Sequence, residues 1–222
     1  HSPMPHLPHY RAKQVSRQRR RHYEIEGHCY PGVTSILSAT KPYEDRQRLW
    51  NWQARVGQAQ AQQITTKASR AGTRLHKAIS AQLQAQPFEL PQELEGFWQS
   101  VAPLLEKVDE AWLVEGAVWH PLEFAGYPDA LMLYEQQLYL CDWKTARRPK
   151  KLAWIEDYCL QVAAYCEAVN WVYRDWDVRV EQAMIAIALE DSPAQTFILG
   201  PEDLSYYWLA FQKRLEQFYS QL

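Results

Sequence analysis

The amino-acid sequence predicts a single α/β domain in which helices flank a central mixed β-sheet. Apolar residues recur at helical spacing before position 111, where the period changes to that of strands. The predicted order is helices, three strands, a helix, two strands and a final helix, which favours one mixed α/β domain. With 222 residues, 47% of them hydrophobic and 23% charged, the chain is long enough for one sizeable core.

Residues 1–22 are predicted to lie outside the domain of residues 23–222. His1, Ser2 and Pro3 precede Met4, which indicates a vector-derived scar. The rest of this segment is dense in basic residues, and such a run is either a disordered tail or a phosphate-binding arm. Both interpretations stay open for Arg11, Lys13, Arg17, Arg19, Arg20 and Arg21.

The helical part is predicted over residues 34–110, after a short strand at 23–25. Thr34 or Ser35 is a candidate cap for its first helix, because a hydroxyl can accept a hydrogen bond from a free N–H group there. Two longer helices follow. They are predicted at 50–83, with possible breaks at Gly57 and Gly72, and at 93–110.

His76 shares one face of the predicted helix 50–83 with Gly72, Ile79 and Leu83, at a spacing of three and four residues. A lone histidine on an apolar face is usually a satisfied core residue. Gly72, one turn earlier, would let another group approach the helix closely and so favours a functional role. Both interpretations stay open.

The catalytic core is predicted over residues 111–200, and it begins with a strand at 112–119. Leu113, Glu115 and Ala117 should share one side of that strand, because side chains alternate along it. Glu115 among apolar neighbours is either an edge residue or a third carboxylate beside a metal ion.

A β-hairpin is predicted over residues 126–144, as two apolar segments joined by a tight polar turn. If the loop is 134–137, Leu133 pairs with Leu138. Asp129 then lies directly opposite Asp142.

Two like charges facing each other destabilise a hairpin, unless a divalent cation lies between them and takes their oxygens. Lys144 should project on the same face as Asp142. An ordinary surface ion pair would explain Asp142 and Lys144 as well, but the run at 138–141 is apolar on both faces, as in a strand buried on both sides. Charges that continue such a strand need partners or a metal, which favours an active site.

The remaining elements are a basic loop, a helix at 153–170, strands at 180–189 and 196–199, and a C-terminal helix in 201–222. One face of the helix at 153–170 carries Tyr158, Gln161, Val162, Tyr165 and Val169. The basic loop contains Arg147, Arg148, Lys150 and Lys151.

Composition narrows the possible partners. The net charge of −2 gives no global basic field, so a nucleic acid would have to be held by a local patch. No apolar run approaches the ~20 residues that span a bilayer, and no secretory signal is visible. The four cysteines lack C-x-x-C spacing, which disfavours a zinc or iron–sulfur cluster. A reducing compartment is expected: the cytoplasm, beside the nucleoid, if the protein is bacterial, with an organelle left open. Cys159 and Cys166 are predicted to be buried on a helix.

In chain order, the motifs resemble the PD-(D/E)XK nuclease superfamily. They are Gly72-x-x-x-His76, Glu115, Pro128-Asp129, Asp142-Trp143-Lys144 and Gln161-x-x-x-Tyr165. The histidine and the Q-x-x-x-Y helix are similar to the branch that holds exonucleases of mitochondrial genome maintenance and the nuclease domains of bacterial recombination-repair helicase–nucleases. The resemblance covers roughly residues 30–175 and implies a restriction-endonuclease-like core.

The resemblance also implies a set of roles. Mg²⁺ or Mn²⁺ would be held by His76, Asp129, Asp142 and the backbone carbonyl of Trp143, and Glu115 would support a second ion or a water. Lys144 would position or deprotonate the attacking water, or stabilise developing charge. Gln161 and Tyr165 would hydrogen-bond the scissile strand or brace Lys144. No iron–sulfur cluster is expected. Further DNA contacts are expected from Thr34, Ser35, Arg147, Arg148 and Lys150.

The expected function is metal-dependent hydrolysis of DNA by a single-strand-specific exonuclease in repair, replication or recombination. Ten tryptophans are many for this length, and a few of them could stack unpaired bases. Replication or repair proteins are possible partners, and a monomer is expected. The alternatives are a structure-selective or restriction-type endonuclease, a non-catalytic nucleic-acid-binding module, and a metal-stabilised structural protein.

Overall fold

A computed structural model describes residues 7–222, so the prediction for His1–Pro3 lies outside the described residues. Its centre is a five-stranded sheet in the order β10-β9-β8-β7-β4. Strands β8 and β9 are parallel and the other neighbours are antiparallel, which confirms the predicted mixed sheet. The strands are β4 (Val108–Val114), β7 (Ala130–Tyr134), β8 (Gln137–Ala146), β9 (Ala183–Leu189) and β10 (Gln195–Leu199).

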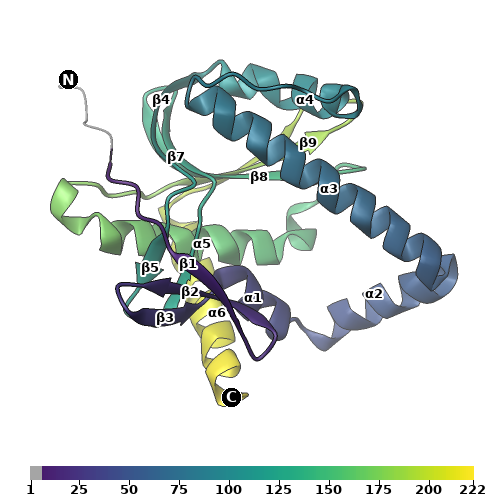
Figure 1. The fold of residues 1–222 in the computed structure, drawn as a ribbon, viewed down its shortest axis with the longest axis horizontal. Coiled ribbons are helices and arrows are strands. Elements are labelled where there is room, and N and C mark those ends of the chain that lie inside the picture. Colours follow the sequence, from purple (N-terminus) through teal and green to yellow (C-terminus); the bar gives the residue numbers. More distant parts are fainter. Residues whose placement is uncertain (1–6) are drawn as a thin grey trace.

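Helices cover both faces of this sheet (Figure 1). Leu131 and Leu140 point toward one face and join the core beneath α1, α5 and α6, whereas Met132 and Cys141 point toward α3 and α4. The helices are α1 (Val33–Ala39), α2 (Tyr43–Val56), α3 (Gln58–Leu83), α4 (Glu95–Leu105), α5 (Glu156–Val172) and α6 (Pro201–Ser220).

The hairpin β7–β8 has the predicted register. Leu133 pairs with Leu138 around a two-residue turn, Glu135–Gln136, in which both residues have positive φ. The last ladder pair is Ala130 with Cys141, so the next position brings Asp129 opposite Asp142. Strand β8 lies between β7 and β9, as expected for a strand buried on both sides.

The N-terminal region departs from the prediction. Residues 13–31 form a three-stranded sheet, so the interpretation of the arginine-rich run as a disordered tail is wrong. Tyr23 and Ile25 are buried against Ala125, and this apolar contact holds a hairpin whose other residues are mostly charged. The strands are β1 (Lys13–Arg17), β2 (Arg20–Ile25) and β3 (His28–Pro31).

The helix boundaries also differ in part from the predicted ones. Gly32 caps α1 by position, so Thr34 and Ser35 lie in the first turn of α1 and cap nothing. Gly57, at φ 87°, separates α2 from α3 as predicted, whereas α3 continues unbroken through Gly72. These two helices form the arm at the right of Figure 1, and α2 buries none of its residues.

Two predicted elements are shorter than expected. The helix predicted at 93–110 is a 3-10 turn, Gln92–Leu94, followed by α4, and the chain is already in β4 at Val108. The strand predicted at 112–119 breaks at Glu115, whose φ of 52° turns the chain before the small hairpin of β5 (Val118–His120) and β6 (Phe124–Gly126). Glu115 therefore shares no strand face with Leu113.

The helix predicted at 153–170 begins three residues later. Its first residues form the 3-10 turn η2 (Leu152–Trp154), and α5 follows. Cys159 and Cys166 are buried on α5, as predicted, and a second 3-10 turn, η3 (Arg174–Trp176), follows it. Among residues 7–222, no helix is long and apolar enough to cross a membrane.

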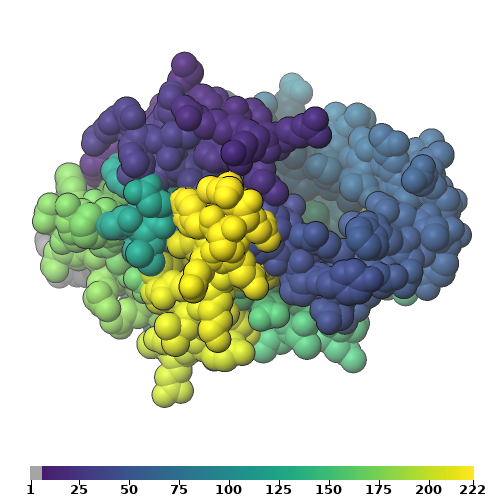
Figure 2. Space-filling model, turned by 90° about the horizontal axis from the view of Figure 1, so that it is seen from below, coloured from purple at the N-terminus to yellow at the C-terminus, as the bar shows by residue number. Residues whose placement is uncertain are grey.

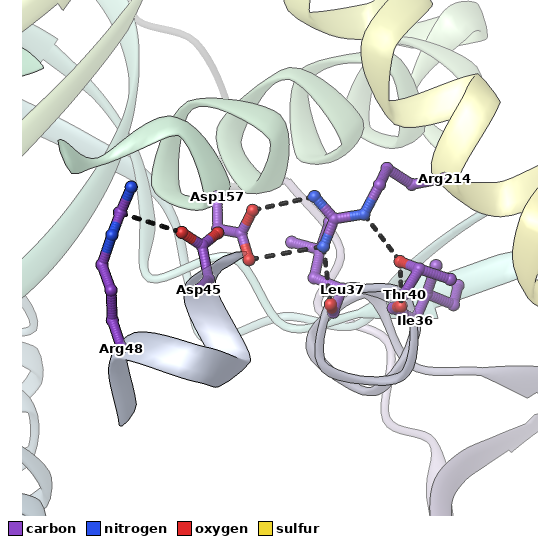
Figure 3. A network of polar contacts seen from close by, with 7 residues as sticks. All are labelled: Ile36, Leu37, Thr40, Asp45, Arg48, Asp157 and Arg214. Atoms are coloured by element: carbon purple, nitrogen blue, oxygen red, sulfur yellow. Dashed lines mark hydrogen bonds and ion pairs between the residues drawn. The ribbon is translucent and has the colours of Figure 1, made fainter. Parts of the chain in front are cut away.

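Arg214 of α6 connects three helices through one guanidinium group (Figure 3). It donates to the Thr40 hydroxyl at 2.7 Å, to the Leu37 carbonyl at 2.6 Å and to Asp157 Oδ1 at 2.9 Å. Only 9% of Arg214 is exposed, so its charge depends on these partners. The contact fixes α1, where the α2–α3 arm begins, against α5.

Candidate active site

The two aspartates predicted to face each other lie side by side in the sheet. Asp129 directly precedes β7, and its Oδ2 accepts a hydrogen bond of 2.7 Å from the backbone N–H of Trp143. Asp142 lies in the middle of β8, where only 3% of the residue is exposed. The hairpin register thus places two carboxylates together in a largely buried position.

Lys144 lies beside them, on the face shared with Asp142. Its Nζ is 2.9 Å from Asp142 Oδ2, and it donates a 2.9 Å hydrogen bond to Gln161 Oε1. Gln161 Nε2 in turn donates to the Tyr165 hydroxyl at 3.4 Å. The Q-x-x-x-Y pair on α5 therefore braces Lys144, which is one of the two roles that the sequence left open.

One oxygen of this cluster lacks a hydrogen bond. The ion pair brings Lys144 close to Asp142 Oδ2, yet its direction does not meet hydrogen-bond geometry, so this buried oxygen has no hydrogen-bond partner among residues 7–222. Burial raises the pKa of the Asp142 carboxyl to about 7, with Lys144 acting against the shift and the charge of Asp129 adding to it. A buried carboxylate whose negative charge is disfavoured in this way would be stabilised by binding a cation.

His76 reaches Asp129 from α3, on the other side of the sheet. Its Nε2 is 3.1 Å from Asp129 Oδ2 and its Nδ1 is 2.7 Å from the Gly72 carbonyl. Both ring nitrogens thus face hydrogen-bond acceptors. Only the protonated ring, an imidazolium, can donate to both of them. Burial lowers the pKa of His76, but the hydrogen bond and charge of Asp129 outweigh burial and raise this pKa to about 9. Burial acts to raise the pKa of Asp129, and the bond to His76 reverses this and holds it below its ordinary value.

Glu115 lines a groove together with His76 and Asp129. The groove has a volume of about 1040 Å³, and its walls also include Arg11, Lys77 and the loop after α3. The Glu115 side chain is exposed, and its backbone N–H donates to the Asp129 carbonyl at 3.2 Å. The turn that interrupts the predicted strand therefore brings Glu115 to the same groove as His76.

These residues offer oxygen ligands that suit a hard cation, although they do not form a complete coordination sphere. Among residues 7–222, no group of three or more His, Cys, Asp or Glu side chains is gathered as a metal site. His76 Nε2 already faces Asp129 Oδ2 at 3.1 Å, so this nitrogen is engaged in a hydrogen bond. What fits a cation is the Asp142 oxygen without a hydrogen bond, beside a second carboxylate.

The residues expected to contact DNA are divided between elements. Arg147 and Arg148 are exposed where β8 ends, and Lys150 follows them. Thr34 is exposed and Ser35 half-buried on α1, which supplies none of the carboxylates.

Three residues with clear structural roles had no assigned role from sequence. Tyr158 lies under Lys144, whose Nζ is 4.6 Å from the ring centroid. Gln195 binds the backbone of Lys150. A Cβ atom at Gly126 would lie 2.7 Å from Tyr165 Cε1, so glycine allows the Tyr165 ring its position. Only Tyr158 carried a sequence signal, because it shares the helix face of Gln161.

The chain is similar to mitochondrial genome maintenance exonuclease 1. It is 31% identical to the mouse protein over 206 residues, 30% to that of Xenopus tropicalis over 198 and 29% to the human protein over 205. The aligned regions cover 87%, 85% and 87% of this chain.

The chain spans 60%, 57% and 59% of the length of these relatives, in the same order. No protein-family model matches the chain. All of the cluster around Asp129, Asp142 and Lys144 belongs to one hairpin and the helix beside it, and the aligned regions extend over most of the chain.

Proposed function

We propose that this chain is a metal-dependent nuclease that hydrolyses phosphodiester bonds in DNA and acts as an exonuclease on single strands. The observation that carries the proposal is the buried cluster of Asp129, Asp142 and Lys144 beside an exposed basic loop. Similarity to proteins named exonucleases, over most of the chain, supports the same activity. Assignment to the PD-(D/E)XK superfamily, and a role in repair, replication or recombination, are part of the proposal.

Asp129 and Asp142 would hold a divalent cation, Mg²⁺ or Mn²⁺, with the Trp143 carbonyl beside them. His76 would join them after losing its Nε2 proton, while its Nδ1–H stays on the Gly72 carbonyl and fixes the ring. Such a cation would lower the pKa of a bound water and neutralise charge on the phosphate. Glu115, reaching from the groove, would hold a second ion or a water.

Lys144 would present a positively charged Nζ atom in a fixed position. Burial lowers its pKa, but Asp142 reverses this effect and the pKa is raised above its ordinary value, so the side chain is an ammonium at neutral pH. Gln161 and Tyr158 both contact the ammonium, through a hydrogen bond and a cation–π contact. These contacts favour a role in orienting the water and stabilising charge on the phosphate over a role as the base.

The surroundings support an unpaired strand as substrate. Figure 2 shows a hollow between the N-terminal residues in purple and the α2–α3 arm in blue. The groove beside His76 carries the cations Arg11 and Lys77 on its wall. Backbone phosphates suit these cations, and the half-buried rings of Phe88 and Tyr127, which line the same groove, can stack unpaired bases.

The test is one incubation of purified protein with four labelled substrates: linear single strand, circular single strand, linear duplex and linear RNA. Each is incubated with Mg²⁺, with Mn²⁺ or with EDTA. The proposal expects the linear DNA strand to be shortened from an end with either metal, and the circle to survive. Cutting of the circle would replace the exonuclease by an endonuclease. Binding without cleavage under every metal condition would replace the enzyme by a binding module.

A further inference from the structure

We propose that Trp154 and the basic loop before it form a stacking subsite for one unpaired base, next to the phosphate that is cut. The subsite rests on the proposed function and names a residue that selects unpaired over paired nucleotides. It takes the aromatic face of a nucleobase on Trp154 and the adjoining phosphates on Arg147, Arg148 and Lys151.

The exposure of Trp154 is the first reason. Trp154 is 61% exposed, although tryptophan is among the residues that gain most from burial. The Nζ of Lys151 lies 5.4 Å from the ring centroid, so one cation already accompanies the ring. An exposed aromatic face beside a cation is the arrangement that single-strand-binding proteins use for a base and its phosphate.

Position relative to the catalytic lysine is the second reason. Trp154 ends η2, one residue before Ile155, the N-cap of α5, and four residues before Tyr158. The ring of Tyr158 lies under Lys144 Nζ, and Gln161 holds the same ammonium one turn further along α5. From Gln161 to Tyr158 to Trp154 the side chains thus go from buried to half-buried to exposed, which leads from the lysine toward the surface.

The anchoring of the loop is the third reason. The backbone N–H of Lys150 donates to Gln195 Oε1 at 2.7 Å, and Gln195 Nε2 donates to the Lys150 carbonyl at 2.9 Å. This pair of hydrogen bonds ties the loop to β10 as a strand neighbour would. A loop held at its centre presents Trp154 and its cations without a large ordering cost on binding.

Charge decides between a nucleic acid and an apolar protein partner. Residues 147–151 carry four cations, and none of them forms an ion pair among residues 7–222. Burying four unpaired cations against an apolar surface is costly, whereas phosphates satisfy them. The exposed indole within this loop therefore fits a nucleobase.

The matched control is Trp171. It is also exposed, at 37%, and also carries a cation, because the guanidinium of Arg174 lies 3.8 Å from its ring centroid. It lies at the other end of α5, 17 residues from Trp154, which is about 25 Å along a helix. The substitution Trp171→Ala therefore removes an equivalent side chain away from the site.

The experiment compares Trp154→Ala, Trp154→Phe and Trp171→Ala in single-strand cleavage. The substrates are oligonucleotides with one abasic nucleotide moved step by step past the cleavage point. Trp154→Ala should raise KM about tenfold, the scale of one base–aromatic stack, with kcat changed far less. Trp154→Phe should recover most of the loss, and Trp171→Ala should behave as the wild type. One abasic position should weaken the wild type about tenfold and leave Trp154→Ala unchanged.

Binding measured by fluorescence anisotropy, in an Asp142→Asn background, separates failure of the subsite from failure of the proposed function. Normal cleavage kinetics and binding in Trp154→Ala would overturn the subsite and leave the nuclease standing. Absence of cleavage in the wild type would overturn the nuclease, and the abasic comparison would then be made on binding alone. Equal losses for Trp154→Ala and Trp171→Ala, or equal sensitivity of Trp154→Ala and wild type to every abasic position, would also overturn the subsite.

Discussion

His76 Nε2 lies 3.1 Å from Asp129 Oδ2, although 53 positions separate the two residues in the chain. Because Nδ1 also faces a carbonyl, both ring nitrogens have acceptors, and this arrangement favours the doubly protonated ring. A metal bound to both residues, as proposed above, would have to displace the proton between His76 and Asp129.

The free energy of unfolding of the metal-free protein should fall as pH rises from about 6.5 to about 9. The pKa of His76 is raised to about 9 in the folded protein. Its contribution to stability is therefore fully present below the ordinary pKa of 6.5 and is lost as the pH rises from 6.5 to about 9. Asp142, whose pKa is raised to about 7, acts in the same direction between its ordinary value of 3.8 and 7. The expected loss from His76 is on the order of 3 kcal/mol. Urea unfolding in EDTA at several pH values measures it, and His76→Ala should remove the slope above pH 7.

Asp142→Asn should abolish cleavage and leave the metal-free protein as stable as the wild type, or more so, at pH 8. The pKa of Asp142 is raised because the folded state disfavours its charge, and asparagine removes that charge at nearly the same volume. Thermal melts in EDTA and a single-strand cleavage assay test the two halves. The exposed Asp191 supplies the control, since Asp191→Asn should change neither. Wild-type turnover in Asp142→Asn would remove this residue from the metal site.

His76→Ala and Lys144→Ala should differ in their response to metal. If His76 is the metal ligand proposed above, His76→Ala should weaken metal binding, and part of its activity should return at high Mn²⁺, a metal that accepts imidazole readily. Lys144→Ala loses no ligand and should not recover. Metal titrations of cleavage, with melting curves beside them, compare the two variants. An unchanged metal requirement in His76→Ala would leave this histidine as a structural partner of Asp129 alone.

Binding to single strands should weaken with salt, despite the net charge of −2. Each phosphate contact contributes about 0.7 to the negative slope of log affinity against log salt concentration. Replacing both Arg147 and Arg148 by glutamine should therefore reduce the slope by about 1.4. Arg179, which is paired with Glu181, is the control, and Arg179→Gln should leave the slope unchanged. Salt titrations of binding, with all variants made in an Asp142→Asn background, measure these slopes. A slope of zero without further substitutions would argue against a nucleic-acid ligand.

Arg214→Leu should destabilise the protein by about 3–5 kcal/mol, because it leaves Asp157, the Thr40 hydroxyl and the Leu37 carbonyl without their donor. Arg48, which pairs with Asp45 at the surface in the same view, is the control (Figure 3). Arg48→Ala should cost less than about 1 kcal/mol. Chemical denaturation of the two variants checks the difference, and equal values would contradict a structural role for the buried guanidinium.

Local periodicity accounts for what the sequence predicted correctly. The pairing of Leu133 with Leu138 follows from a two-residue turn, and the facing of Asp129 and Asp142 follows from that pairing. The shared face of Asp142 and Lys144 follows from strand alternation. The brace from Gln161 was one of two predicted roles, because helical spacing gives a face but not the neighbour that the face meets.

Where the sequence failed, contacts between distant segments decided the outcome. The arginine-rich run became a hairpin because Tyr23 and Ile25 pack on Ala125, about a hundred residues later. Glu115 left its predicted strand face through a left-handed turn, a conformation that no residue-type preference indicated.

The sequence by itself determined the hairpin, the two carboxylates and the lysine on its strand, because these positions depend on spacing within nineteen consecutive residues. Only the tertiary structure decided that His76 meets Asp129, that Tyr158 lies under Lys144 and that Gln195 holds the loop of Lys150. Each of these contacts joins elements that are separate in the sequence. Their distances depend on how α3, α5 and β10 are placed in three dimensions, which periodicity along one segment does not encode.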